Sequence, residues 1–466
     1  MPRNFPWFKL FIALLTLPFF LWPGALLVRD LRDPALRGAG IPRRARELHA
    51  SLSPRIAAWA RERVATRRAE AAALHDVPTT EWPMFTAVFY LMATESLVID
   101  WESHGRRGPS PAVEAAWAVA AAKALLLDPS HHSWVRRHWG DDYLHDRNVF
   151  FRGLIIGGLA SYERITRDGT ALPVLRDQVE TLSAELDASP LGVLEDYPRE
   201  TYPIDVLATI AFMQRADAVL GTDHSAFFAR SRRGFTGPMA DDLGLVPFRM
   251  DLPSGAHVQP SRGIGTSWIL AFAPDLYGLD TARDWYGRYE RSFYQRRGWA
   301  EGFREYARGR YADEFSFEID AGPVVDGFGT AANAFGIAAA RRNGRFDHAY
   351  ALSAELAAAS WTLPGGTLLF PRLASHAADA PYLGEAASMF FLTVQPAPGA
   401  AIVQGGGVPG LARIGLLVFF GVPLLAWLRA LRAMRRSSDE ARATGARGLR
   451  GANCLELHRR RDSWMP

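Results

Sequence analysis

Cysteine and lysine are nearly absent from this chain of 466 residues. The one cysteine, Cys454, lies near the C-terminus, which excludes internal disulfides, cysteine-ligated metal clusters and a catalytic cysteine in the main body. Lysine occurs only as Lys9 and Lys123, so arginine supplies nearly all of the positive charge. Acidic residues are interspersed with the arginines, and the formal net charge is only +4. Because no basic stripe stands out, we expect no nucleic-acid partner.

Long hydrophobic runs occur in only two places. Residues 10–28 and 405–428 are each long enough to cross a bilayer, which requires about 20 apolar residues. Two alternatives stay open, because the first run could be a cleaved signal peptide and the second a buried core helix. We favour membrane helices, since the second run is followed at once by four arginines, namely Arg429, Arg432, Arg435 and Arg436.

The arginines around the second run also predict a topology. Residues 374–412 contain no arginine or lysine, whereas the tail 429–466 is basic, and positive charge marks the cytoplasmic side. We therefore predict a multi-pass protein of the inner (plasma) membrane, with residues 1–9 and 429–466 in the cytoplasm. Residues 29–404 then form the main domain on the periplasmic, extracytoplasmic side.

Helical periodicity dominates this main domain. Apolar residues at three- and four-residue spacing predict surface helices over 54–75, 112–127, 173–187, 280–296 and 346–360. Stretches that are apolar nearly all round predict buried helices, with starts near Pro83, Asn148, Pro203, Arg262, Gly327 and Gly384. The intervals between these starts are roughly 60 residues, which fits a repeat of helical hairpins. We predict an all-α fold, an (α/α)6 toroid of six helical hairpins flanked by N- and C-terminal transmembrane helices.

In a closed ring the inner helices run the same way, so their N-termini, with unpaired N–H groups, meet at one mouth. Carboxylic acids gathered there suit acid–base chemistry, because burial can keep one protonated while another stays ionised. Asp205 is the leading catalytic candidate, since it interrupts the apolar helix PIDVLATIAF; a helix-capping role is the alternative. The other catalytic candidates are Glu195, Glu200, Glu318, Asp320 and Asp326, and a loop salt bridge is the alternative for Glu318 and Asp320.

Further polar and aromatic residues share this predicted mouth. Arg152 follows Asn148 by four residues on one helix face, and it could bind an anionic substrate group or pair with Asp205 or Asp326. The aromatic rings could stack on a sugar or an apolar chain, or simply fill the core. The histidine-rich segment 131–146 fits no defined zinc spacing, so we expect neither a metal nor a cofactor. The substrate-binding candidates are Trp82, Asn148, Arg152, Tyr202, His257, Arg262, Trp268, Asn333, Tyr382 and Glu385.

Four segments resemble the linalool dehydratase/isomerase family: EDYPRETYPIDVLATIAF, SRGIGTSWILAFAPDL, DGFGTAANAFGIAAAR and NVFFRGLIIGGLASYERIT. The resemblance implies an (α/α)6 barrel with a cavity at the mouth, and hydration, dehydration or isomerisation of an alcohol. The family's acid–base cysteines are absent, and Glu195 and Ile204 occupy the places that resemble theirs. A histidine implied near the start of the second inner helix is replaced by the run from Arg152 to Leu154.

Three readings of function follow. The first is a membrane-anchored lyase or isomerase that acts through carboxylates on an isoprenoid, lipid-linked or sugar alcohol. The second is an envelope glycan hydrolase or polysaccharide lyase, and the third is a non-catalytic module that binds a lipid or saccharide or assists assembly. An enzyme needs Asp205 and at least one more candidate carboxylate in a single cavity, whereas a binding module tolerates those residues in salt bridges.

Overall fold

The computed structural model describes residues 7–73, 76–310, 315–376 and 379–461 of the chain. It divides into two compact units, one formed by residues 27–410 and the other by the segments that precede and follow them. Helices dominate both units, as the periodicity predicts, and the strands are short.

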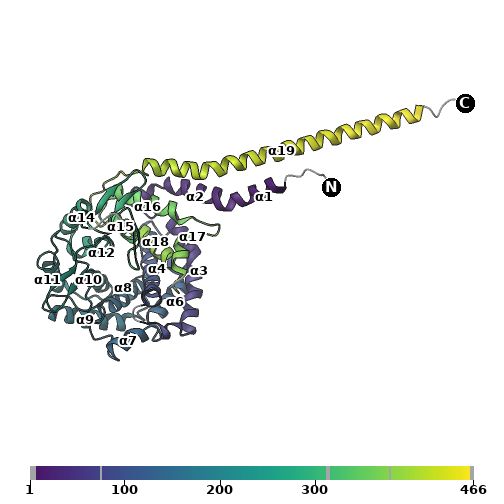
Figure 1. The fold of residues 1–466 in the computed structure, drawn as a ribbon. Coiled ribbons are helices and arrows are strands. Elements are labelled where there is room, and N and C mark those ends of the chain that lie inside the picture. The colour runs from purple at the N-terminus through teal and green to yellow at the C-terminus, as the bar shows by residue number, and fades with distance from the viewer. Residues whose placement is uncertain (1–6, 74–75, 311–314, 377–378, 462–466) are drawn as a thin grey trace. The chain divides into compact units, whose positions relative to one another are not determined.

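Six apolar helices pack against one another in a closed cycle. Each contacts the next in chain order, and the last returns to the first. In Figure 1 the helices of this inner set lie inside a periphery formed by helices such as α3, α9 and α14. The starts agree with the sequence prediction to within a few residues, apart from the first. The inner set is α4 (Val77–Ser103), α8 (Val149–Thr166), α10 (Pro203–Leu220), α12 (Gly263–Leu270), α15 (Thr330–Arg342) and α18 (Leu383–Thr393).

Helix α4 begins six residues before the predicted start at Pro83, which lies inside the helix. Proline lacks the N–H that would bond to the carbonyl four residues earlier, here that of Thr79. The buried guanidinium of Arg63 donates a hydrogen bond of 2.8 Å to this carbonyl oxygen instead. The substitute donor explains how a helix can continue through a residue that normally ends one.

The outer helices follow the amphipathic stretches, with two differences. The first of them spans Arg43–Ala65 and not 54–75, because the chain turns at Arg67 in a left-handed conformation (φ 51°). Helix α11 was not predicted. The outer set is α3 (Arg43–Ala65), α6 (Ala116–Leu126), α9 (Leu172–Ala188), α11 (Ser225–Phe235), α14 (Leu279–Phe293) and α16 (Phe346–Ser360). Shorter helices in the connections are α5 (Pro111–Glu114), α7 (Ser133–Trp139), α13 (Ala273–Tyr277) and α17 (Leu369–His376).

In the described part of the chain, three small antiparallel sheets occupy the loops that lead into α12 and α15. Strand β1 (Arg249–Asp251) pairs with β2 (Ala256–Gln259), and β3 (Tyr294–Arg296) pairs with β4 (Glu301–Phe303). The third sheet has the order β5–β6–β7. Its strands are β5 (Ser316–Glu318), β6 (Gly322–Val325) and β7 (Phe328–Gly329).

Small residues allow α8 and α10 to approach closely. A Cβ atom at Gly153 would lie 2.1 Å from the hydroxyl oxygen of Thr209, and one at Gly157 would lie 2.8 Å from the ring of Phe212. The glycines in FFRGLIIGGLA are therefore required by packing, since interiors have no room for additional methyl groups at such distances.

Arg341 joins the two ends of the main unit. Its guanidinium is fully buried and donates to three backbone carbonyls, those of Ala35 (2.9 Å), Gly40 (2.6 Å) and Val394 (2.8 Å). Each of these carbonyls would lose its partner if the guanidinium were removed. Burial lowers the pKa of Arg341 to about 10, with the charge of Asp33 acting in the opposite direction, so Arg341 stays charged at neutral pH.

We expect Arg341→Met to lower the free energy of unfolding by about 3 kcal/mol, because a buried unsatisfied acceptor costs about 1–3 kcal/mol. Thermal or denaturant unfolding in detergent checks this. Arg283→Met is the matched control, since Arg283 makes only an exposed ion pair with Asp280, and it should change stability by less than about 0.5 kcal/mol. Equal effects of the two substitutions would contradict the role given to Arg341.

The second unit contains α1 (Trp7–Thr16) and the start of α2 (Trp22–Leu31), together with α19 (Gly410–Arg461). Within this unit the two apolar segments pack together, since the rings of Phe20 and Phe419 lie 5.6 Å apart. A Cβ atom at Gly24 would come within 2.8 Å of the Phe420 ring. This contact places a small residue at a close helix–helix approach, as is common between membrane helices.

Among the described residues, three helices are long and apolar enough to cross a membrane: Leu14–Leu31, Val77–Ser103 and Gly410–Arg436. The first and third overlap the predicted spans 10–28 and 405–428. The second is α4, most of which is buried inside the main unit. Its apolar character is explained by its place among the inner helices, and it provides no reason for a third span.

Candidate active site

The inner helices of the main unit surround a cavity of about 570 Å³. Its lining comes from the inner helices and the loops before them, with Leu356 of α16 and Pro371 of α17. Among the residues that the structure describes, no lysine, arginine or histidine lines this cavity. Six of the sequence-predicted site residues do line it: Trp82, Glu200, Tyr202, Asp205, Trp268 and Asp320.

Asp205 lies in the first turn of α10, and its side chain is only partly accessible. Helix α10 has no side-chain capping bond, and the Asp205 carboxyl group makes no hydrogen bond or ion pair with any residue that the structure describes. The helix-capping alternative for Asp205 therefore lacks the hydrogen bond that it requires. Burial, with the charge of Asp320 as a second cause, raises the pKa of Asp205 to about 8. Its carboxyl group is mostly protonated at neutral pH and faces the cavity.

Glu81 is a second acid in the same cavity. It is buried in the second turn of α4, and its carboxyl group accepts a hydrogen bond from the Tyr197 hydroxyl. Burial raises the pKa of Glu81 to about 8, and the charges of Asp320 and Asp205 act in the same direction. Glu81 is not among the catalytic candidates predicted from the sequence. The signal that selected Asp205, a carboxyl group near the start of an apolar helix, applies to Glu81 as well.

Behind the cavity wall lies Asp196, which is almost fully buried. Its Oδ2 accepts a hydrogen bond of 2.6 Å from the backbone N–H of Tyr202. The pKa of Asp196 is raised well above its usual range, because burial and the neighbouring Asp205 both disfavour its charge. Glu200, by contrast, lies at the mouth, where it accepts a 2.7 Å hydrogen bond from the Tyr202 hydroxyl and lies 3.5 Å from Arg249.

Asp320 lies at the open end, directly after strand β5, where its side chain is exposed. Its negative charge raises the pKa of both Glu81 and Asp205, so it ionises before they do. Burial also raises the pKa of Asp320 above its usual range, opposed by the charge of Arg262, so the three acids lose their protons at different pH values with Asp320 first. Carboxyl groups whose environments separate their pKa values in this way can divide the roles of acid and base.

The rest of the cavity is lined largely by aromatic rings. The Phe89 ring stacks on that of Phe85 at 5.2 Å and meets that of Trp268 at 5.9 Å. The Trp268 ring lies 5.2 Å from that of Phe335. Ten aromatic residues line the cavity: Trp82, Phe85, Phe89, Phe150, Tyr197, Tyr202, Phe248, Trp268, Phe335 and Phe391. Such a wall favours an apolar ligand, and its ring faces can stabilise a positive charge.

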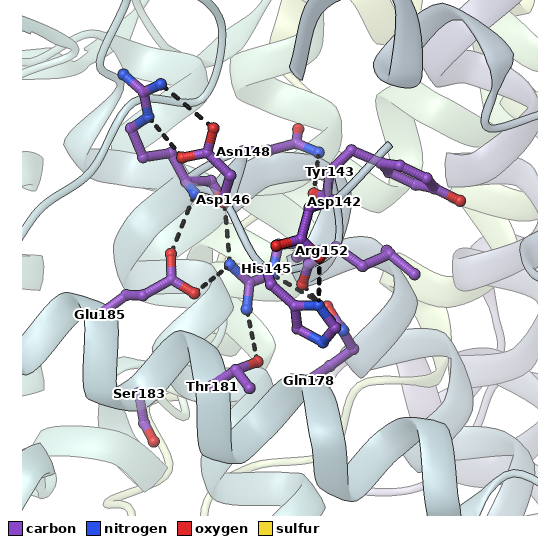
Figure 2. Close-up of polar contacts among 12 residues, drawn as sticks. Asp142, Tyr143, His145, Asp146, Asn148, Arg152, Gln178, Thr181, Ser183 and Glu185 are labelled. Atoms are coloured by element: carbon purple, nitrogen blue, oxygen red, sulfur yellow. Dashed lines mark hydrogen bonds and ion pairs between the residues drawn. The ribbon is translucent and has the colours of Figure 1, made fainter. Parts of the chain in front are cut away.

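Arg152 lies outside the cavity lining, and its partners differ from those that the sequence suggested. Its fully buried guanidinium bonds to the outer helix α9, to Gln178 (3.0 Å), Thr181 (2.8 Å) and Glu185 (2.8 Å), as Figure 2 shows. It pairs with neither Asp205 nor Asp326. Asn148 lies nearby in a left-handed conformation (φ 54°), with its amide directed to the Tyr143 carbonyl (Figure 2).

We therefore expect Arg152→Met to lower the free energy of unfolding by about 3 kcal/mol, the usual result of breaking a buried charge pair. Ligand binding per folded molecule should stay unchanged, because the guanidinium lies outside the cavity lining. Thermal unfolding and ligand titration of the same preparation separate the two effects. A loss of ligand affinity in fully folded protein would restore Arg152 as a binding residue.

The remaining charged candidates form ion pairs away from the cavity lining. Glu195 bonds to Arg147 at 3.0 Å, Asp326 lies 3.2 Å from Arg297, and Glu385 lies 2.7 Å from Arg372. Arg262 pairs with both Glu305 and Glu318. The salt-bridge alternative thus describes Glu318, whereas it does not describe Asp320.

The uncharged candidates outside the lining have structural contacts. The side chain of Asn333 holds strand β4 by two hydrogen bonds to Phe303. It accepts one from the Phe303 N–H (2.7 Å) and donates one to the Phe303 carbonyl (3.0 Å). The Tyr382 ring meets that of Trp59 edge-on at 6.0 Å. His257 is exposed on strand β2.

The protonated acids give the folded protein a pH-dependent stability. Glu81 and Asp205 keep a proton up to a pKa of about 8 when folded, whereas the unfolded chain releases it near about pH 4. Their contribution is complete below about pH 4 and is lost as the pH rises towards 8, by up to about 1.4 kcal/mol per pH unit and group. We expect the melting temperature to fall over this range, and to fall less in Asp205→Asn. If the melting temperatures of the wild type and of Asp205→Asn fell equally with pH, Asp205 would not be protonated in the folded protein.

No protein-family model matches this sequence, and no curated protein does so either. The chemistry must therefore be argued from the site itself. That site combines two carboxylic acids with pKa values of about 8, a further carboxyl group at the open end and an aromatic wall.

Proposed function

We propose that residues 27–410 form an (α/α)6 toroid anchored in the inner membrane by the helices at its two ends. The closed cycle of contacts through α4, α8, α10, α12, α15 and α18 supports the toroid. Two apolar helices at the predicted positions support the anchors, and the arginines that follow the second support a periplasmic main unit.

We further propose that the protein is an acid–base lyase or isomerase for an uncharged, apolar alcohol, of which isoprenoid alcohols are the model class. The observation that carries this proposal is the protonated Asp205, unpaired among the described residues, facing an aromatic cavity. The resemblance to the linalool dehydratase/isomerase family points to the same reaction type. In this chain Asp205 and the other carboxyl groups of the cavity would supply the acid–base chemistry that cysteines supply in that family, although they stand at other positions.

The reaction needs one acid and one base. The Asp205 carboxyl group donates its proton to the substrate hydroxyl, and the C–O bond breaks to release water. The electron-deficient carbon lies against ring faces such as that of Trp268, which lower the energy of the developing cation. Asp320 or Glu200 then removes a proton from the adjacent carbon to give the alkene. Alternatively, water returns to the other end of an allylic cation and its extra proton passes back to the Asp205 carboxylate, which gives the isomeric alcohol and restores the acid.

The cavity lining favours this substrate over the alternatives. A phosphorylated or carboxylated substrate would meet several carboxyl groups and no cation among the described lining residues. A glycan requires many hydrogen-bonding groups, whereas most of this lining is apolar. A binding module has no need for Asp205, Glu200 and Asp320 in one cavity, and that grouping is what an enzyme requires.

The test is an isotope experiment with the full chain in detergent or nanodiscs. Linear and branched prenyl alcohols of increasing length are incubated in water enriched in ¹⁸O, and the products are separated by gas chromatography with mass detection. We expect alkene formation and ¹⁸O incorporation for allylic alcohols, and neither for the corresponding prenyl phosphates. Turnover of a glycan, or binding of an alcohol without any exchange, would replace this proposal with one of the two alternatives.

A further inference from the structure

Exposed apolar side chains flank the cavity on two segments that are distant in sequence. Phe315, Phe317 and Ile319 lie on and beside strand β5, and Phe370 and Leu373 lie on helix α17. The exposed fraction of each lies between 44% and 71%. We call these five residues the apolar rim. Large apolar side chains grouped at a surface mark contact with a membrane or another apolar partner.

The rim is continuous with the cavity. Ile319 itself lines the cavity, and so does Pro371, which lies between the two rim residues of α17. Residues along β5 alternate, because Phe317 faces outward while Glu318 on the opposite side pairs with Arg262. The rim therefore reaches the cavity lining on both of its segments.

The half of the rim on α17 is connected within the main unit to the segments that lead towards both anchors. The Tyr350 hydroxyl on α16 donates to the Leu31 carbonyl, and the Asp347 N–H at the start of α16 donates to the Val403 carbonyl. Helix α17 follows α16 along the chain. Helix α16 has 15 residues, a length of about 22 Å, and it leads from the contacts with Leu31 and Val403 to the connection that enters α17.

We propose that the apolar rim enters the bilayer surface and that the cavity takes its ligand directly from the lipid. A lipid bilayer is the occupant that the anchors hold within reach, and α16 lying along its surface would bring α17 into contact with it. Phenylalanine and leucine on one face of a short segment are typical of insertion to the depth of the headgroup–acyl boundary. The inference rests on the proposed membrane anchoring.

The experiment uses site-directed labels in the full chain. Cys454→Ser removes the one native thiol, and single cysteines at Phe317, Phe370 and Leu373 are labelled with an environment-sensitive fluorophore. The protein is reconstituted in nanodiscs with and without lipids that carry a nitroxide quencher near the headgroup. We expect each rim label to lose roughly half of its emission to the quencher lipid. Leu417→Cys on α19 reports the anchor, and Trp117→Cys, an exposed aromatic position on α6, is the control that should not be quenched.

Each outcome decides a different point. Quenching at Leu417 without quenching at the rim would overturn the rim proposal and leave the anchoring intact, whereas no quenching at Leu417 would overturn both. Rim labels shielded from aqueous iodide but not quenched by lipid would assign the rim to a protein contact instead. A paired variant, Phe317→Asp with Leu373→Asp, should slow uptake of a vesicle-borne prenyl alcohol by at least about tenfold while detergent-dissolved alcohol still binds. Unchanged uptake would also contradict the proposal.

Discussion

Asp205→Asn is expected to lower kcat/KM for an allylic alcohol by about 10²–10⁴-fold, the usual effect of removing a general acid. The amide keeps the size of the side chain but cannot release a proton to the leaving hydroxyl. The loss should appear in kcat more than in KM, because the carboxyl group acts on the bond that breaks and contributes little to holding the apolar chain. Product formation by gas chromatography, with binding followed separately by titration, measures both quantities.

Two controls make this result specific. Asp326→Asn removes a carboxylate that is paired with Arg297 outside the cavity lining, and it should keep nearly full activity. The melting temperature of Asp205→Asn at neutral pH should be equal to that of the wild type or higher, so that misfolding is excluded as the cause. Activity within a few fold of the wild type would transfer the acid role to Glu81, whose environment raises its pKa to a similar value.

The order of the helices could be predicted from the sequence because the signals are local. All-round apolar stretches opened by proline or glycine mark the starts of α10 and α12 to within one residue. The start of α4 could not be found in this way, since it depends on a distant guanidinium, that of Arg63, which replaces the bond that Pro83 cannot make. A prediction from neighbouring residues does not include partners of that kind.

The place of the candidate site in the fold could be predicted from the sequence, but which of its carboxyl groups face the cavity could not. Position at the start of an apolar helix identifies Asp205, and Glu81 has the same signal. For adjacent residues in an extended loop, the one that faces inward is harder to predict, because successive side chains point in opposite directions. Glu195 pairs with Arg147 away from the cavity lining, while Asp196 turns inward and is buried. The sequence contains both carboxylates, and only the tertiary fold decides which of them is buried.

The value of kcat/KM should fall steeply with increasing pH in the alkaline range. Asp205 must be protonated to act as the acid, and its pKa in the folded protein is about 8. We therefore expect kcat/KM to be level where the base is ionised and Asp205 is protonated, and to fall about tenfold per pH unit above the pKa of Asp205. Since the charge of Asp320 contributes to the raised pKa, Asp320→Asn should move the midpoint to lower pH as well as reduce the maximum rate. A pH–rate profile of each protein measures these midpoints.

The direction of that second shift separates two explanations of the profile. If the fall of kcat/KM at alkaline pH reports the ionisation of Asp205, removal of a neighbouring negative charge lowers the pKa of Asp205, and the midpoint of the fall moves to lower pH. If the fall came from unfolding at high pH, the same substitution would relieve repulsion among the carboxylates, and the midpoint would move to higher pH. A midpoint that stays near pH 8 in Asp320→Asn would mean that burial alone sets the acidity of Asp205, and Asp320 would then be assigned to proton removal only. The burial that keeps the acid protonated also costs stability as the pH rises, so catalytic competence and a less stable folded state have one physical origin in this cavity.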